Sequence, residues 1–176
     1  MTQAKRQDYF VYVGAARGDD GADGIYIYRL DMATGALTSI GSVLDIHNPS
    51  FLASHPNGRM LYAIDEDRSQ SPSEAYVRAY AINPQTGELT FVNRQPSHGQ
   101  GLCHLMTDRN GRFLFTAHYS GGSISVLPLR EDGGLGEATD VIQHEGSSVH
   151  PRQDTAHPHS IYPDANTRFV FVPDLG

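Results

Sequence analysis

The chain has 176 residues and a formal net charge of −7, with 13 Lys and Arg against 20 Asp and Glu, which argues against a nucleic-acid surface. A single cysteine, Cys103, excludes an internal disulfide and fits a reducing compartment. The polar start MTQAKRQDYF is unlike a signal peptide, and no stretch approaches the ~20 apolar residues that span a bilayer. We therefore expect a cytoplasmic protein with no nucleic-acid or membrane partner.

Taken in chain order, short runs rich in β-branched and aromatic residues predict β-strands. They read YFVYV, GIYIYRL, MLYAI, VRAYAI, FLFTA, SISVLPL and FVFV, and clusters of Gly, Pro, Asn or Asp separate them. No segment of helix length has a 3.6-residue apolar period. The sequence therefore predicts an all-β protein.

These predicted strands recur within a longer repeat. Three segments align on an arginine that follows a turn: 49–64, 102–117 and 158–173. The aligned arginines are Arg59, Arg112 and Arg168, with spacings of 53 and 56 residues. A second unit, YRLDMATGALTSI, matches YAINPQTGELTFV, and PLREDGGLGEATDV is a looser third copy.

Each period holds four predicted strands, A to D. In the best-defined period they cover about 51–55, 59–65, 75–82 and 88–95. The A–B turn, HPNGR, contains an Asn-Gly pair that supplies positive φ, and the C–D turn is NPQTG. Four antiparallel strands per unit are typical of a β-propeller blade, and three aligned copies favour this fold over a β-sandwich.

The repeat predicts about three and a quarter four-stranded blades. Residues 1–7 are expected to be disordered, and 8–176 to form a partial propeller. Its parts are an incomplete first blade at 8–46, blades at 47–97 and 98–145, and the start of a fourth at 156–176. Propellers close with 4–8 blades, so we expect the N-terminal half of a longer protein. Its open edges predict self-association.

Five segments in order resemble the lactonase family of seven-bladed β-propellers. They are GIYIYRLDMATGALT, NPSFLASHPNGRMLYA, GRFLFTAHYSGGSISVLPLREDGGLGE, HPRQDTAHPHSI and RFVFVPDLG. That family includes the propeller-type 6-phosphogluconolactonase and 3-carboxy-cis,cis-muconate lactonizing enzyme. The resemblance implies lactone chemistry on a small anionic substrate, without a required cofactor. It also implies downstream Gly-Pro-Arg-His and Asn-Glu elements, which this sequence lacks. His118 replaces the usual Asn, and DANTR replaces the usual Asp-Pro-x-Gly-Arg turn.

Propeller topology puts the D–A and B–C loops on the same face. Seven residues are therefore predicted to gather at one mouth of the channel: His104, His118, Tyr119, Arg152, His157, His159 and Asp174. Lactone hydrolysis needs a base and a donor to the developing oxyanion, roles that suit His and Arg near neutral pH. We predict His159 or His157 as the base, with His104 as a further catalytic candidate. Arg152 would bind the anion, and Asp174, Tyr119 and His118 would complete the substrate contacts.

Each of these residues also has a structural interpretation. His159 can cap the channel, His157 can face solvent, His104 can pack, and Asp174 can bond to backbone alone. His118 and Tyr119 can simply shape their loop. His47, His55, His98 and His144 are expected to be structural. A metal site at His157 and His159, with His104 or Asp174, is an alternative that the resemblance disfavours, so we expect no metal. Cys103 lies in no nucleophile motif.

Two kinds of function follow from these observations. The first is a lactone hydrolase that resembles 6-phosphogluconolactonase, in the pentose phosphate pathway, with a 3-carboxymuconate cyclase as the alternative enzyme. The second is a non-catalytic propeller fragment or binding module. We expect the 176-residue chain alone to be inactive, because a propeller site draws on several blades.

Overall fold

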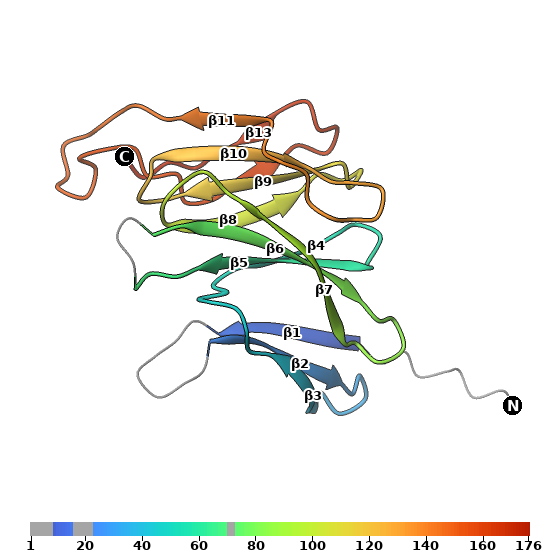
Figure 1. Ribbon diagram of the computed structural model, residues 1–176. Helices are drawn as coiled ribbons and strands as arrows, with labels where there is room; N and C mark the ends of the chain where they lie inside the picture. Colours follow the sequence, from blue (N-terminus) through green and yellow to red (C-terminus); the bar gives the residue numbers. More distant parts are fainter. Residues whose placement is uncertain (1–8, 16–22, 70–72) are drawn as a thin grey trace, which may run out of the picture.

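The computed structural model describes residues 9–15, 23–69 and 73–176, and every regular element within them is a β-strand (Figure 1). This confirms the predicted all-β class. The predicted disordered segment 1–7 lies outside the described residues. No helix in the described part of the chain has the length and apolar character needed to cross a membrane.

The strands form four antiparallel sheets whose order follows the sequence. The first sheet holds β1 (Tyr9–Ala15), β2 (Gly24–Leu30) and β3 (Leu37–Val43). The second holds β4 (Leu52–Ser54), β5 (Met60–Glu66), β6 (Ala75–Ile82) and β7 (Leu89–Pro96). The third holds β8 (Leu102–Thr107), β9 (Phe113–His118), β10 (Ser123–Pro128) and β11 (Asp140–Gln143). The last sheet holds β12 (Tyr162–Pro163) and β13 (Val170–Phe171).

The second sheet contains the predicted A, B, C and D strands, and each strand end lies within one residue of its predicted position. Strand A, β4, is shorter than predicted, but its ladder continues on both sides. The Ile64 N–H donates to the Phe51 carbonyl at 3.2 Å, and the His55 N–H donates to that of Met60 at 3.0 Å. The predicted positive φ of the turn is at Gly58, with φ of 69°.

Apolar side chains pack between successive sheets rather than within one central core. Ile25 and Ile46 meet Leu61 and Tyr80 between the first and second sheets. A larger cluster between the second and third sheets has as members Met60, Tyr62, Ile64, Val77, Leu102, Leu105, Leu114, Leu127 and Leu135. Phe115 and Ile124 meet Ile161 between the third and last sheets. Face-to-face packing of this kind, sheet after sheet, is how propeller blades bury their apolar faces.

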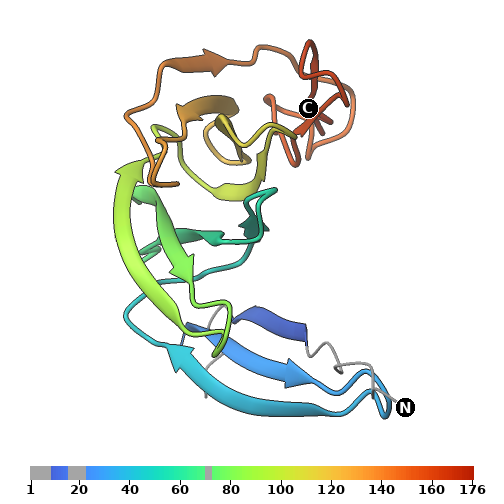
Figure 2. The same ribbon diagram turned by 90° about the vertical axis from the view of Figure 1, so that its right-hand side faces the viewer.

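The four sheets follow one another along an arc (Figure 2). The first strands of neighbouring sheets are in contact, β4 with β8 and β8 with β12. An aromatic row links these innermost positions across three blades. The His104 ring lies 4.3 Å from the Phe51 ring and 5.1 Å from the Tyr162 ring, measured between centroids. This row of rings therefore lies along the inner wall of the partial propeller.

The turn between β12 and β13 carries local strain. Thr167 stands where the other two aligned turns have Gly58 and Gly111, and all three positions have positive φ, 53° at Thr167. A β-branched residue is disfavoured in this region, and the buried Thr167 Oγ1 has no hydrogen-bond partner in the described structure. The DANTR departure in the sequence therefore has a conformational cost.

Replacing Thr167 with glycine should stabilise the chain. Relief of the left-handed strain is expected to add about 1 kcal/mol to the free energy of unfolding. Urea unfolding of the two proteins at one pH measures the difference. Ala165→Gly, in the same turn but at a position without positive φ, is the matched control and should not stabilise. A Thr167→Gly variant no more stable than the parent would show that the turn is relaxed.

Candidate active site

Three aromatic rings meet at the face predicted from the loop order. The Tyr119 ring stacks on that of His157, with centroids 4.5 Å apart and planes 13° from parallel. The His159 ring approaches Tyr119 edge-on, at 5.4 Å and 84°. Tyr119 follows β9, and the two histidines precede β12, so the B–C loop of one blade meets the D–A loop that leads into the next. The predicted gathering of these three residues is therefore observed.

His157 is held by its backbone and its ring. Its N–H donates to Asp174 Oδ1 at 2.6 Å, and its ring Nδ1 lies 2.9 Å from the Tyr119 carbonyl oxygen. A carbonyl only accepts, so Nδ1 carries the proton and Nε2 keeps a lone pair in the neutral ring. The hydrogen bond to the Tyr119 carbonyl raises the pKa of His157, and Asp154, 3.4 Å from Nε2, adds to the rise. This arrangement suits a general base near neutral pH.

Asp174 organises the loop around His157. Its Oδ1 accepts the N–H groups of His157 and Gly176, and its Oδ2 lies 2.8 Å from His144 Nδ1. Partial burial would raise the pKa of Asp174, but these hydrogen bonds outweigh it and lower the pKa. Both carboxylate oxygens of Asp174 are thus already in contact with groups of the protein. His144, which we predicted to be structural, is one of those partners.

His104 lies in the wall beneath this cluster and is almost fully buried. Its Nδ1 accepts the Ile161 N–H at 3.3 Å, and its ring packs between Phe51 and Tyr162. Burial, followed by the nearby His159, lowers the pKa of His104. A neutral ring whose Nδ1 lone pair is already used favours the packing interpretation over the catalytic one.

His118 corrects one of our predictions. Its side chain is fully buried, with Nδ1 3.2 Å from both the carbonyl and the hydroxyl oxygen of Ser123. The Gly99 backbone covers the ring, since a Cβ at Gly99 would overlap it. Burial lowers the pKa of His118 to about 4. Because the ring has no access to the surface, His118 does not contact substrate, and its role is structural.

Arg152 is exposed in the loop before His157, and its described contact is with a residue of the same loop. Its backbone N–H donates to His150 Nδ1 at 3.2 Å. In the described part of the chain its guanidinium makes no hydrogen bond or ion pair with the other predicted site residues. The anion-binding role predicted for Arg152 therefore stays a prediction.

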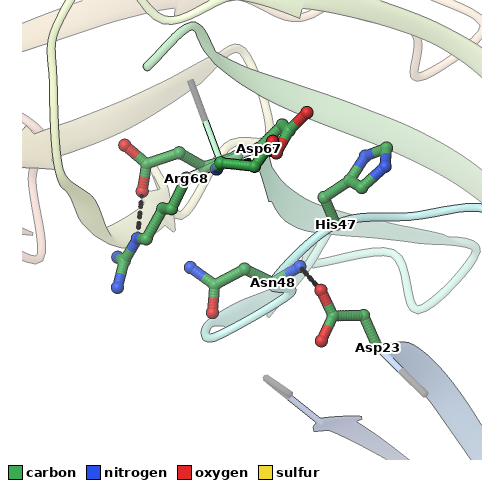
Figure 3. A pocket seen from close by; sticks show the side chains of 7 residues that line it. Asp23, His47, Asn48, Asp67 and Arg68 are labelled. Atoms are coloured by element: carbon green, nitrogen blue, oxygen red, sulfur yellow. Dashed lines mark hydrogen bonds and ion pairs between the residues drawn. The ribbon is translucent and has the colours of Figure 1, made fainter. Parts of the chain in front are cut away.

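A cavity of about 470 Å³ opens on this same face, between the first two blades (Figure 3). The residues that line it come from the end of β5 and from the loops before β2, β4 and β6: Asp23, His47, Asn48, Glu66, Asp67, Arg68 and Ser69. Its lining has three carboxylates against one guanidinium. Arg68 Nε donates to the buried Glu66 at 2.8 Å, which fixes the guanidinium at the cavity wall. The sequence places the B–C loop that holds Arg68 on this face but predicts no site residue in it.

A short chain of hydrogen bonds joins the cavity to the ring cluster. Glu66 Oε1 accepts the Gly101 N–H at 2.9 Å, and the Gly101 carbonyl accepts the Tyr119 N–H at 2.8 Å. Tyr119 in turn stacks on His157. The buried Glu66 carboxylate thus connects the loops of the second and third blades. The cavity and the ring cluster are therefore linked through the backbone of Gly101.

Two other chemistries were weighed from the sequence. Within the described residues, no group of three or more His, Cys, Asp or Glu side chains is arranged to hold a metal. Burial raises the pKa of the Cys103 thiol, and its Sγ lies 3.4 Å from the Ala117 carbonyl oxygen. A protonated thiol is a poor nucleophile, which agrees with the structural interpretation of Cys103.

Comparisons with known proteins place the chain in a family. A family model described as "Lactonase, 7-bladed beta-propeller" matches residues 10–176. A 6-phosphogluconolactonase of Bacillus subtilis is 34% identical over 169 residues, 96% of this chain and 47% of the relative. One of Formosa agariphila is 30% identical over 94% of this chain and 47% of the relative. The chain thus spans about half the length of the curated relatives it matches.

Solved structures agree with the sequence relatives. A Pseudomonas aeruginosa periplasmic gluconolactonase superposes with a TM-score of 0.86 at 29% identity, over 97% of this chain and 48% of that one. A protein of Bacteroides fragilis superposes with a TM-score of 0.87 at 30% identity, over 100% of this chain and 48% of that one. The predicted resemblance and the propeller architecture are both confirmed. The chain belongs to the lactonase family of seven-bladed β-propellers.

Proposed function

We propose that this chain forms part of a lactone hydrolase that opens a phosphosugar lactone, 6-phosphogluconolactone, to its acid. Relatives that match nearly the whole chain carry the name 6-phosphogluconolactonase. The observation that carries the proposal is the geometry of His157. Its tautomer is set by the Tyr119 carbonyl, and its Nε2 lone pair is left for a proton.

In this proposal His157 acts as the general base. Nε2 takes a proton from a water molecule, whose oxygen attacks the lactone carbonyl carbon. The ring C–O bond then breaks, and the departing alkoxide recovers the proton from the imidazolium, which yields the open hydroxy acid. Tyr119 holds the imidazole through its ring and its carbonyl. His159, at the edge of Tyr119, is exposed and remains the second candidate for the base.

The acidic cavity favours a sugar lactone over carboxymuconate. In its lining the carboxylates of Asp23, Glu66 and Asp67 outnumber the guanidinium of Arg68. Hydroxyl groups of a sugar lactone can donate to carboxylate oxygens, whereas a tricarboxylate has no such donors and meets more repulsion than a phosphosugar lactone does. Arg68 and the exposed Arg152 are the two candidates for holding the anionic group of the substrate.

Two assays on the product of the complete gene test this function. One follows loss of 6-phosphogluconolactone, and the other follows loss of 3-carboxymuconate. We expect hydrolysis of the lactone and no turnover of carboxymuconate. Turnover of carboxymuconate alone would assign the cyclase function instead. Activity on neither substrate would favour a non-catalytic binding module and would refute the proposed hydrolase.

Three further expectations remain predictions. They are a cytoplasmic location, the lack of nucleic-acid or membrane partners, and self-association through open blade edges. Apolar side chains on the last sheet motivate the last of these, since Phe169 and Phe171 are about three-fifths exposed, at 60% and 61%. Exposed apolar patches beyond a few hundred Å² usually mark a partner surface or an aggregation site.

A further inference from the structure

A second cavity, of about 390 Å³, lies at the opposite end of the blades. It is lined by the A–B turns of the second and third blades and by the loop that links β10 to β11. These connections emerge opposite to the B–C and D–A loops, because neighbouring strands run antiparallel. The cavity is therefore separate from the candidate active site.

The lining of this cavity is rich in guanidinium groups. Arg130 forms a bidentate pair with Asp132, with Nε–Oδ1 and Nη2–Oδ2 distances of 3.1 and 3.0 Å. Arg59 and Arg112 have no carboxylate partner among residues 9–15, 23–69 and 73–176. The described contact of the Arg112 guanidinium is with the Phe113 ring, at 5.7 Å from the centroid. Three guanidinium groups thus line the cavity with two carboxylates, those of Glu131 and Asp132, and Asp132 is already paired with Arg130.

The sequence repeat explains why this cavity is cationic. At the first position of the A–B turn, the third and fourth blades have Asp108 and Asp164. Each carboxylate accepts the backbone N–H groups that close its turn, with Asp108 Oδ1 2.6 Å from the Arg112 nitrogen. Asp164 also lies 4.0 Å from Arg168 Nε. The turn aspartate therefore caps the turn in both blades, and in the fourth blade it also partly neutralises an arginine.

In the second blade this position is His55. Its Nδ1 accepts the Asn57 N–H at 3.1 Å, so the capping acceptor is kept. Its Nε2 lies 3.1 Å from the Gly111 carbonyl oxygen, to which it donates. With one nitrogen accepting and the other donating, the ring is neutral. The exchange of Asp for His removes a negative charge beside Arg59 and ties the turns of two blades together.

We propose that this cavity binds a small anion bearing a phosphate group, held by Arg59 and Arg112. The planar guanidinium offers parallel N–H donors that match phosphate oxygens. The cavity volume falls within the range of small-molecule sites, about 300–1,000 Å³. Arg130, already paired with Asp132, lines the same cavity and orders its rim. The site would act independently of lactone hydrolysis at the other face.

Calorimetric titration of the chain with pyrophosphate, at constant ionic strength, tests this site. We expect saturable binding that the double variant Arg59→Gln/Arg112→Gln weakens by more than about tenfold, since two charge-assisted hydrogen-bond partners of the phosphate are lost. The matched control is Arg94→Gln/Arg109→Gln, which removes the same charge outside the cavity and should bind as the parent does. Equal loss in both double variants would show a non-specific effect of charge and overturn the site.

A second pair of variants tests the role of the repeat position. His55→Asp restores the carboxylate of the other turns and should weaken pyrophosphate binding by about threefold to fivefold. His55→Asn keeps a neutral capping acceptor and should bind as the parent does. Equal binding by the two variants, or no saturable binding by the parent, would overturn the proposal. Titration with 6-phosphogluconate and with inorganic phosphate then distinguishes a metabolite from the free ion. Because the readout is binding, a failed lactonase assay leaves this test unaffected.

Discussion

Replacing His157 with glutamine should lower kcat/KM for 6-phosphogluconolactone by about 10²- to 10⁴-fold in the product of the complete gene, the usual contribution of a positioned general base. Glutamine can still donate to the Tyr119 carbonyl, which His157 contacts at 2.9 Å, but it offers no basic nitrogen. The variant therefore removes the proton acceptor and keeps the loop contact.

The matched control is His150→Gln, in the same loop. The His150 side chain is exposed, and its described contact is with the Arg152 N–H, so its replacement should leave kcat/KM unchanged. The pH dependence of kcat/KM gives a second readout. An ascending limb that follows a raised histidine pKa should vanish in His157→Gln. If His157→Gln retained most of the parent's activity, the general base would be His159 instead.

The chain should lose stability as the pH falls, because the buried ring of His118 resists protonation. His118 has a pKa of about 4 in the folded chain, against about 6.5 for an unperturbed histidine. The unfolded chain therefore takes up a proton first as the pH falls. The stabilisation is fully present above the unfolded pKa and is lost between about pH 6.5 and pH 4. We expect a loss of about 2 kcal/mol by pH 5 from this one group.

Urea unfolding at pH 7.5 and at pH 5 measures this loss. His118→Gln is the informative variant, because glutamine can donate to the Ser123 carbonyl and cannot be protonated. The parent should lose about 2 kcal/mol more than the variant over this interval. His104, whose pKa is also lowered by burial, adds to the fall in both proteins and cancels in the comparison. Equal losses would show that His118 is not the titrating group.

Most of the fold could be predicted from the sequence because the blade repeats. Runs rich in β-branched and aromatic residues predicted β5 and β6, and the repeated turns indicated how the strands follow one another. A three-residue strand such as β4 carries too few residues for a pattern of its own, so its ends were misplaced. Thr167 shows a different limit, since only coordinates reveal that it occupies a glycine-like conformation.

Only part of the candidate site could be predicted from the sequence. Loop order placed Tyr119, His157 and His159 on one face, and there they meet. The histidines differ in their contacts with residues that are distant in the sequence. Gly99 covers the ring of His118, and the carbonyl of Tyr119 contacts the ring of His157. No local pattern encodes these contacts. Arg68 was missed for the same reason, because its link to the buried Glu66 lies in a loop without a motif.

The central claim is that this face works only when several blades close around the channel. The most direct measurement is the rate of 6-phosphogluconolactone hydrolysis by the purified 176-residue chain, with its size determined in the same sample by size-exclusion chromatography. We predict a self-associating or marginally stable chain without catalysis, because displacement of catalytic groups by even ~1 Å can cost about a hundredfold in rate. A stable monomer that hydrolyses the lactone as fast as the product of the complete gene would contradict this account.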